Sequence, residues 1–281
     1  MRRGRLRYLL GAAFHQMAWT EWGPPEGSPV ICVHGLTRNG RDFDVLAQAL
    51  AGQGRRVFCP DLPGRGASDW LPDPRAYAPP SYVMALAHLL ARLEGPVDWV
   101  GTSLGGICGM LLAAAQGTPI RRLVLNDVGS QVPAAALQRI TAYLAEAPGP
   151  SDLAGIEAYL RRVHAPFGPL TDAQWRHMAE TSTRALPDGR LALHHDPAIA
   201  LPLAEAEKGA PSGPIDLRPI WQAVRQPVLI LRGAESDVLE EATAAAMAQR
   251  PGVELATLPG IGHAPALMAP DQVARILAFL G

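Results

Sequence analysis

The sequence predicts an α/β fold in which a mostly parallel sheet is covered by helices on both faces. Short, continuously apolar runs alternate with amphipathic helical patterns toward both ends of the 281-residue chain. Hydrophobic residues make up 48% of the chain and charged residues 18%, as in ordinary globular domains. Strands that are apolar throughout are typical of a sheet buried on both faces, and intervening helices favour parallel pairing.

Six apolar runs have the length and composition of strands, at residues 30–33, 56–59, 97–100, 123–125, 228–231 and 253–258. Apolar residues spaced three and four apart predict helices over 43–50, 83–93 and 273–280. Parallel sheets carry their functional groups at the carboxyl ends of the strands. We therefore expect the site residues directly after these runs.

The pattern changes between residues 130 and 224. Residues 133–147, 152–163 and 171–185 have helical patterns, with no buried-strand pattern between them. We expect this segment to form an all-helical cap inserted into a core made of residues 1–129 and 225–281.

Composition and net charge indicate which kinds of partner the protein binds. The net charge of −1 gives no global field that would recruit nucleic acid or an anionic membrane, so a small molecule is the expected partner. Residues 1–13 imitate a secretory signal, but they lead into residues 15–23, which alternate like a strand. Cys32, Cys59 and Cys108 form neither a disulfide framework nor a zinc site. We expect a cytoplasmic protein, and the sequence leaves its oligomeric state open.

The pentapeptide Gly101-Thr102-Ser103-Leu104-Gly105 is the most informative local pattern. It follows an apolar strand candidate and precedes a small-residue helical stretch, as a G-x-S-x-G nucleophile elbow does. A serine on such a strained turn needs glycines nearby and lies at a helix N-terminus, which favours developing negative charge. Ser103 is the predicted nucleophile.

A serine hydroxyl needs a base within hydrogen-bond reach. Of the eight histidines, His263 is the preferred base, because it lies in a glycine-rich loop between the last strand candidate and the last helix. For the carboxylate that orients this base, the order Ser, Asp, His favours Asp237, just beyond the strand at 228–231. Asp127, at the end of the neighbouring run, is the alternative acid, and Glu235 ranks below both.

Two backbone N–H groups are expected to form an oxyanion hole. One belongs to Leu104, directly after the nucleophile, and the other to Leu36, in the loop after the strand at 30–33. Arg38 in the same loop either ties the loop down or contacts an acidic group of the substrate, and we favour the structural role.

Five segments taken together resemble the α/β-hydrolase superfamily along nearly the whole chain: His34-Gly35-Leu36, residues 61–68 with the D-x-x-G-x-G-x-S pattern, Gly101–Gly106, Gly233–Leu239 and Gly262-His263. The resemblance implies an eight-stranded, mostly parallel sheet with a helical cap inserted after the strand that ends at Asp127. Thr102 stands where relatives often carry His or Gln, and Leu104 where many carry Met, so the subfamily is not defined.

Ser103 sets this chain apart from the similar haloalkane dehalogenases and epoxide hydrolases, which use an aspartate at the elbow. Serine, histidine and aspartate together predict acyl transfer, in which an acyl-enzyme forms and water releases the acid. We expect hydrolysis of a carboxylic ester or lactone of a small, largely apolar substrate, with no cofactor and no metal; a thioester fits the same chemistry.

Alternatives remain open. Carbon–carbon bond hydrolases of the meta-cleavage type and cofactor-free perhydrolases use the same triad, and the former would need a Lys or Arg in the cap facing Ser103. A hydrolase-like ligand sensor with little turnover is an alternative of another class, and a scaffold with an incidental triad is the last.

Three aromatic residues of the cap region, Phe167, Trp175 and Trp221, are candidates to line an apolar substrate pocket. Residues of this kind at helical spacing also commonly form a cap's own core. His194, His195 and Asp196 suggest a metal cluster, but without further placed ligands a turn or a hydrogen bond between cap and core fits them better.

Overall fold

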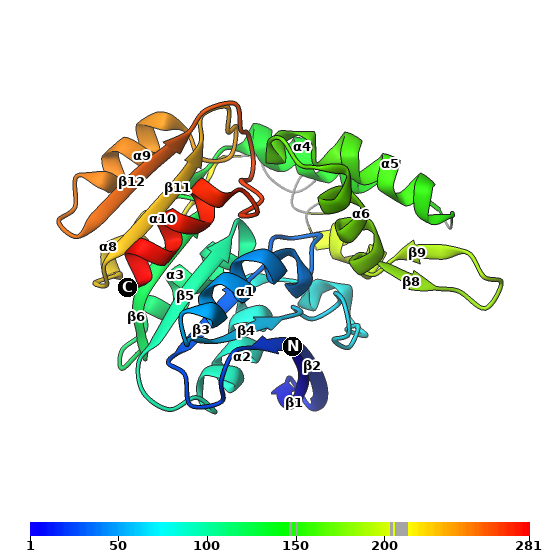
Figure 1. The fold of residues 1–281 in the computed structure, drawn as a ribbon, viewed down its shortest axis with the longest axis horizontal. Helices are drawn as coiled ribbons and strands as arrows, with labels where there is room; N and C mark the ends of the chain where they lie inside the picture. The colour runs from blue at the N-terminus through cyan, green and yellow to red at the C-terminus, as the bar shows by residue number, and fades with distance from the viewer. Residues whose placement is uncertain (146–147, 150, 203–204, 206–212) are drawn as a thin grey trace.

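The computed structural model describes residues 1–145, 148–149, 151–202, 205 and 213–281. Its centre is an eight-stranded sheet with the order β1-β2-β4-β3-β5-β6-β11-β12 (Figure 1). The strands are β1 (Arg2–Leu10), β2 (Ala13–Trp22), β3 (Pro29–Val33), β4 (Arg56–Pro60), β5 (Val97–Thr102), β6 (Ile120–Asn126), β11 (Val228–Gly233) and β12 (Val253–Leu258).

Strands β3 to β12 of this sheet run parallel, and β1 and β2 add an antiparallel edge. The predicted mostly parallel, eight-stranded sheet is therefore confirmed, and each of the six strand candidates lies within an observed strand.

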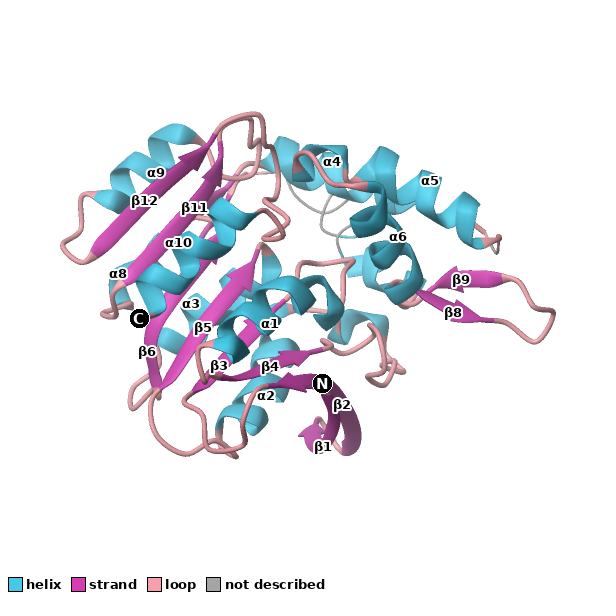
Figure 2. Ribbon diagram, in the orientation of Figure 1, coloured by secondary structure: helices cyan, strands magenta, loops and turns pink. Residues whose placement is uncertain are grey.

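Helices cover both faces of the sheet (Figure 2), because successive residues of a buried strand point to opposite sides. On one face, Val30 and Cys32 pack with the helices α1 (Asp44–Gly52) and α10 (Pro270–Leu280). On the other, Ile31 and Val33 belong to the core under α2 (Pro79–Leu90), α3 (Leu104–Ala113), α8 (Arg218–Ala223) and α9 (Glu241–Ala248). The buried cysteines Cys32, Cys59 and Cys108 are all free thiols.

Strand β1 was not among the predicted strands. Its arginines mask the alternation: Leu6 and Tyr8 are buried, whereas Arg5 before Leu6 and Arg7 between the two are exposed. The strand pairs along its whole length with β2, which contains the alternation predicted at residues 15–23. Within the described part of the chain, no helix has the length and apolarity to cross a membrane.

The residues between β6 and β11 leave the sheet and return to the strand beside it, because β6 and β11 are paired neighbours. They form the helices α4 (Ala134–Ala145), α5 (Leu153–Val163) and α6 (Asp172–Thr181), and the short 3-10 helices η3 (Ala165–Phe167) and η4 (Pro197–Ala200). Figure 1 shows α4, α5 and α6 gathered beyond the sheet, apart from the helices that cover its faces.

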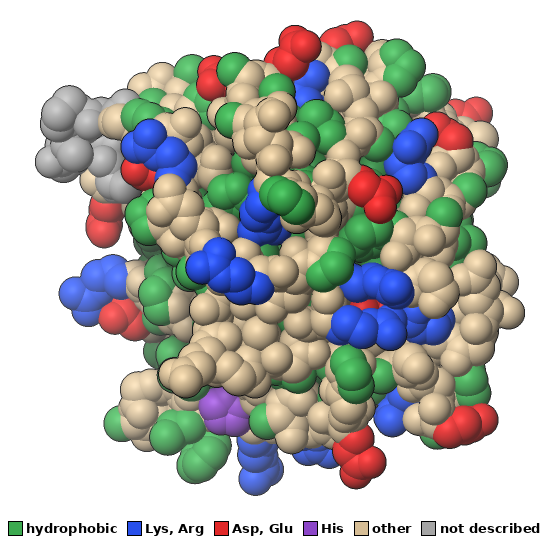
Figure 3. All heavy atoms as spheres, turned by 90° about the vertical axis from the view of Figure 1, so that its left-hand side faces the viewer, with side chains coloured by type: hydrophobic (Ala, Val, Ile, Leu, Met, Phe, Trp, Pro, Cys, Tyr) green, Lys and Arg blue, Asp and Glu red, His purple; other side chains and the backbone are tan. Residues whose placement is uncertain are grey.

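The prediction that this segment is all-helical was wrong. Strands β8 (Thr183–Ala185) and β9 (Leu191–Leu193) form a hairpin, and β7 (Gln131–Val132) pairs with β10 (Ile215–Asp216). These strands are only two or three residues long, too short to carry an apolar periodicity that a sequence pattern could reveal. On the surface viewed in Figure 3, basic and acidic side chains lie interspersed among apolar ones.

Candidate active site

Ser103 lies on the turn between β5 and α3, as the strand-turn-helix pattern predicts. Its backbone has φ 51° and ψ −114°, a strained conformation for a residue other than glycine. The flanking glycines are also required because a side chain at either position would clash with the backbone. A Cβ at Gly101 would lie 2.3 Å from the carbonyl oxygen of Gly105, and a Cβ at Gly105 would lie 2.0 Å from the carbonyl oxygen of Val33. The chain can therefore turn here only with glycine on both sides.

His263 reaches Ser103 from the loop between β12 and α10. Its Nε2 lies 2.9 Å from the Oγ of Ser103, and its side chain is 11% exposed. A hydroxyl at this distance is positioned to donate to a neutral imidazole, which is the arrangement that activates a serine.

The carboxylate beside His263 belongs to Asp127 and not to Asp237. The Oδ2 of Asp127 lies 2.7 Å from Nδ1 of His263, and Asp127 is fully buried. Asp237, the preferred acid in the sequence interpretation, instead forms an ion pair with Arg139 in which both side chains are substantially exposed. The preference for Asp237 therefore has to be corrected. Asp127 follows β6 directly and has φ 58°, so it meets the histidine without an intervening loop.

The loop after β11 contributes donors to this carboxylate. Gly233 N–H donates to Oδ1 of Asp127 at 2.8 Å, and Ser236 Oγ donates to Oδ2 at 2.6 Å. Ser236 in turn accepts from the N–H groups of Val238 and Leu239 at 3.2 and 3.0 Å. The sequence interpretation chose the right loop, but missed Ser236, which stands one residue before the aspartate that it favoured.

The loop after β3 lies against Ser103 and is held in place by hydrogen bonds of His34 and Arg65. Nδ1 of His34 donates to the carbonyl of Gly35 at 2.7 Å, and Leu62 N–H donates to His34 Nε2 at 2.9 Å. The fully buried Arg65 donates from Nε to the carbonyl of Leu36 at 2.8 Å. Burial above all, with the charges of Arg65 and Arg38 assisting, lowers the pKa of His34 to about 3, so this side chain is a neutral support.

Two backbone N–H groups were predicted to face a developing oxyanion. Leu104 is the first residue of α3 and directly follows Ser103, while Leu36 lines the pocket beside Ser103. Arg38 forms a two-bond ion pair with Asp42, at 2.8 and 2.6 Å. The charge of Arg38 thus ties the loop to the 3-10 helix η1 (Gly40–Phe43).

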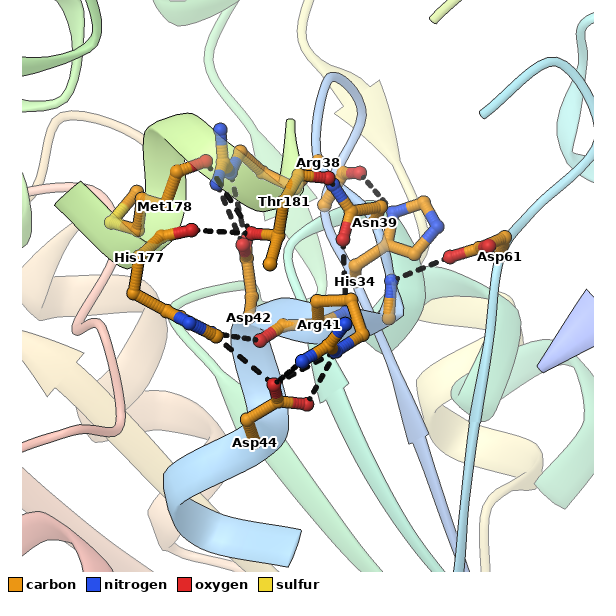
Figure 4. Close-up of polar contacts among 12 residues, drawn as sticks. His34, Arg38, Asn39, Arg41, Asp42, Asp44, Asp61, His177, Met178 and Thr181 are labelled. Carbon is orange, nitrogen blue, oxygen red and sulfur yellow. Dashed lines mark hydrogen bonds and ion pairs between the residues drawn. The ribbon is translucent and has the colours of Figure 1, made fainter. Parts of the chain in front are cut away.

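The segment between β6 and β11 contacts the same loop through α6 (Figure 4). His177 lies 3.2 Å from the carboxylate of Asp44, and Asn39 donates to the carbonyl of Thr181 at 3.0 Å. The hydrogen bond to Asp44 raises the pKa of His177 in spite of its partial burial. Helix α6 is therefore attached by polar contacts to the segment that follows Leu36.

A pocket opens over Ser103 and His263 between the sheet and this segment. Its lining is mostly apolar, with a few polar and charged groups: His34, Gly35, Leu36, Thr37, Arg38, Asp42, Phe43, Thr102, Arg139, Ile140, Tyr143, Val163, His164, Phe167, Met178, Ala264, Pro265, Ala266 and Met268. Helix α4 contributes three of these residues, none of which the sequence interpretation singled out, because its helical pattern does not reveal which face turns toward the sheet.

Of the three aromatic candidates, only Phe167 lines this pocket. Trp175 is buried in a separate cluster with residues of α5 and α6, such as Leu160. Trp221 belongs to the core beneath α8, where the guanidinium of Arg250 lies 3.8 Å from its ring centroid. The assignment of these two tryptophans to the pocket was wrong, because both pack inside their own clusters.

The His194, His195 and Asp196 segment forms hydrogen bonds that join it to neighbouring turns. Asp196 accepts from the hydroxyl of Tyr77 at 2.6 Å and from the N–H of Ala198 at 2.9 Å, at the start of η4. Among the residues that the structure describes, no group of three or more His, Cys, Asp or Glu side chains is arranged to hold a metal ion.

Comparisons with known proteins show which proteins the chain is similar to. The 3-hydroxybutyrate-oligomer hydrolase of Cupriavidus necator is 41% identical over 280 residues, which cover 97% of this chain and 95% of the relative. The 2-(acetamidomethylene)succinate hydrolase of Mesorhizobium japonicum is 28% identical over 84% of this chain and 82% of the relative.

Among solved structures, an alpha/beta hydrolase from Novosphingobium aromaticivorans is 40% identical and superimposes with a TM-score of 0.85, covering 99% of this chain and 98% of that chain. The sequence model of the alpha/beta hydrolase family matches residues 30–276. With its sheet, its elbow and these similarities, the chain belongs to the α/β-hydrolase family.

Proposed function

We propose that this chain is a serine hydrolase that cleaves a carboxylic ester through an acyl-enzyme. The observation that carries the proposal is the continuous contact from Ser103 Oγ to His263 Nε2, 2.9 Å, and from His263 Nδ1 to Asp127 Oδ2, 2.7 Å. The similarity to the relative named 3-hydroxybutyrate-oligomer hydrolase supports it.

In the proposed reaction, Ser103 Oγ attacks the ester carbonyl while its proton passes to Nε2 of His263. Asp127 accepts from Nδ1–H, which holds the imidazole in the required tautomer and stabilises the imidazolium. The negative charge on the carbonyl oxygen is stabilised by the N–H groups of Leu36 and Leu104. The imidazolium returns the proton to the departing alcohol, and water then repeats the sequence to release the acid.

The hydrogen bonds of His34 and Arg65 position the Leu36 amide for its proposed role in the oxyanion hole. Their hydrogen bonds to the carbonyls of Gly35 and Leu36 fix the peptide groups on both sides of Leu36 before a substrate arrives. Donors fixed in advance need no reorganisation when charge develops, which is the main source of their catalytic effect.

For the substrate, we propose an ester or lactone of a small hydroxy acid, including short oligomers of the kind named for the Cupriavidus relative. The largely apolar lining around Phe167, Ile140 and Met178 supports a short hydrocarbon chain beside the scissile bond. We further propose that residues 130–224 act as the cap of a core made of residues 1–129 and 225–281, and that the protein is cytoplasmic, which its three buried free thiols support.

The carbon–carbon bond alternative has one observation in its favour. Arg139, from α4, lines the pocket over Ser103, and such a cation is what cleavage of a dienone acid would need. The carboxylate of an acidic ester would use the same cation, so substrate assays and not geometry separate the two reactions.

The decisive experiment is turnover of aryl esters of graded chain length, together with hydroxy-acid dimers, lactones, a thioester and a meta-cleavage dienone. Multiple turnovers of the esters, lost in Ser103→Ala while the fold is retained, support the proposal. Undiminished ester hydrolysis by Ser103→Ala would refute it. A single slow burst from the wild type would favour a ligand sensor, and turnover of the dienone alone would favour the carbon–carbon reaction.

A further inference from the structure

The lining of the pocket over Ser103 includes positively charged side chains. Two cationic side chains line the pocket among the described residues, Arg38 from the loop after β3 and Arg139 from α4. Asp42 is the acidic residue in the same lining. An ester that carries a negative charge would gain from this arrangement, provided that one of the two guanidinium groups is free to receive it.

Arg38 is already committed to another group. Two of its nitrogens donate to the two oxygens of Asp42, as Figure 4 shows, and the side chains are only 5% and 17% exposed. Separating a two-bond pair at this depth would leave two poorly solvated charges. Arg38 is therefore a fixed charge of the wall and not the group that an incoming anion would bind.

Arg139 is in a different position. It pairs with Asp237 at 2.5 and 2.9 Å, but here the side chains are 40% and 46% exposed. Asp237 is not part of the pocket lining, whereas Arg139 is. An ion pair with this much solvent access contributes little to stability, so breaking it to bind another carboxylate costs little. Arg139 thus lines the pocket while its counterion, Asp237, lies outside the lining. A carboxylate of the substrate could replace that counterion.

His164, another residue of the pocket lining, adds no negative charge that would compete with a substrate for Arg139. His164, which lines the pocket and stacks on Phe167 with ring centroids 4.5 Å apart, is buried. Burial, followed by the charges of Arg38, His263, His195 and Arg139, holds the pKa of His164 well below its ordinary value. This ring is neutral at physiological pH, and the positive field that it experiences includes that of Arg139.

From this arrangement we propose that Arg139 binds a carboxylate of the substrate, with Asp237 as the counterion that the carboxylate displaces. The preferred substrates are then acidic esters, in which a free carboxylate is attached to the alcohol or acyl part, and not neutral esters of the same size. This inference rests on the proposed ester hydrolase function, which it narrows. It gives Asp237 a role in selecting the substrate and not in orienting His263.

The test uses two compounds with the same scissile bond, the dimer of 3-hydroxybutyrate with its free carboxylate and the same dimer with a terminal carboxamide. The variants are Arg139→Gln, Arg139→Lys and Asp237→Asn. Arg176→Gln is the matched control, because Arg176 is an exposed arginine of α6 that pairs with Glu180 at 3.1 Å and is absent from the pocket lining. The measured quantity is the ratio of kcat/KM for the acid to kcat/KM for the amide.

The wild type is expected to prefer the acid. Arg139→Gln should lower the ratio by about 10- to 100-fold, mainly through KM for the acid, as expected for loss of a charge-assisted hydrogen bond. Arg139→Lys should restore part of the ratio, and Asp237→Asn should raise it, because the competing carboxylate is gone. Arg176→Gln should leave it unchanged. If the ratio stays the same in Arg139→Gln, because kcat/KM for the acid and kcat/KM for the amide are both unchanged or fall equally, the proposal is overturned.

A binding measurement keeps the inference testable if neither dimer is hydrolysed. Calorimetry with Ser103→Ala should show tighter binding of the acid than of the amide, and Arg139→Gln added to that protein should abolish the difference. Equal affinities in Ser103→Ala would overturn the carboxylate site. Retained ester turnover in Ser103→Ala would instead refute the proposed function, so the two failures are distinguishable.

Discussion

Ser236 Oγ and His263 Nδ1 meet on one oxygen, Oδ2 of Asp127, at 2.6 and 2.7 Å. The loop after β11 therefore holds the Asp127 carboxylate in place beside the histidine, because Gly233 N–H also donates to its other oxygen, Oδ1. The loop that was expected to supply the acid supplies its hydrogen-bond donors.

Replacing Ser236 with Ala should lower kcat for ester hydrolysis about 10-fold with little change in KM, because one donor to a buried carboxylate is lost. Ser236→Thr should restore much of the rate. Steady-state kinetics measure the effect, and Ser182→Ala is the control, since Ser182 is buried with no hydrogen-bond partner for its hydroxyl among the described residues. Equal losses in the two alanine variants would mean that Ser236 has no specific role.

The two aspartates should differ sharply when each is replaced by Asn. Asp127→Asn is expected to reduce kcat by about 10⁴, as removal of the orienting carboxylate does in a serine-protease triad. Asp237→Asn should change turnover of a neutral ester less than about 10-fold, because its partner is an exposed arginine. Single-turnover acylation rates provide the measurement. A larger loss in Asp237→Asn would restore the assignment that the geometry disfavours.

The elbow glycines should be intolerant of even a methyl group. Gly105→Ala places a Cβ 2.0 Å from a backbone oxygen, so we expect a loss of unfolding free energy of about 1–3 kcal/mol or failure to fold. Gly35→Ala is the comparison, since the nearest atoms to its added Cβ are 3.7 Å away or more. Urea unfolding of both variants tests this difference, and equal stabilities would contradict it.

Buried histidines should make stability fall with decreasing pH. The pKa of His34 is lowered to about 3 in the fold, so below its ordinary value of 6.5 the unfolded chain binds a proton that the native state does not. This contribution is complete above pH 6.5 and is lost, at up to about 1.4 kcal/mol per pH unit, as pH falls from 6.5 toward 3.

In His34→Gln the unfolding free energy should consequently depend less steeply on pH between 6.5 and 4.5. His195, with a pKa lowered to about 4 chiefly by burial, contributes in the same direction and keeps the slope above zero. Urea titrations at several pH values give the slopes, with the surface histidine of α2 replaced in His88→Gln as control. Identical slopes in His34→Gln and the wild type would disprove the assignment.

The sheet was predictable because its strands are buried on both faces. Runs such as residues 30–33 and 228–231 contain only apolar residues, and this composition is distinctive. The elbow was predictable because its backbone requires glycine at two fixed positions. Strand β1 was harder to predict, since its buried residues Leu6 and Tyr8 alternate with arginines whose charge dominates the local composition.

The choice between the two aspartates was harder for a different reason. Asp127 and Asp237 follow neighbouring parallel strands, so both were plausible at the same edge of the sheet. The outcome depends on where each chain turns, and the positive φ of Asp127 leaves no mark in the residue types around it. The pocket residues of α4 were hard to predict for a related reason, because packing between distant segments determines which face of α4 points toward the pocket.

The pairing of β5 with β6 has a consequence for thermal inactivation. Thr102 pairs with Asn126, and Ser103 N–H donates to the carbonyl of Asn126 at 2.9 Å, so Ser103 and Asp127 are fixed to each other by the sheet. His263 is the member of the three that comes from a loop between elements. On gentle heating, activity should therefore disappear when the loop at residues 259–269 opens locally, while the strands remain intact.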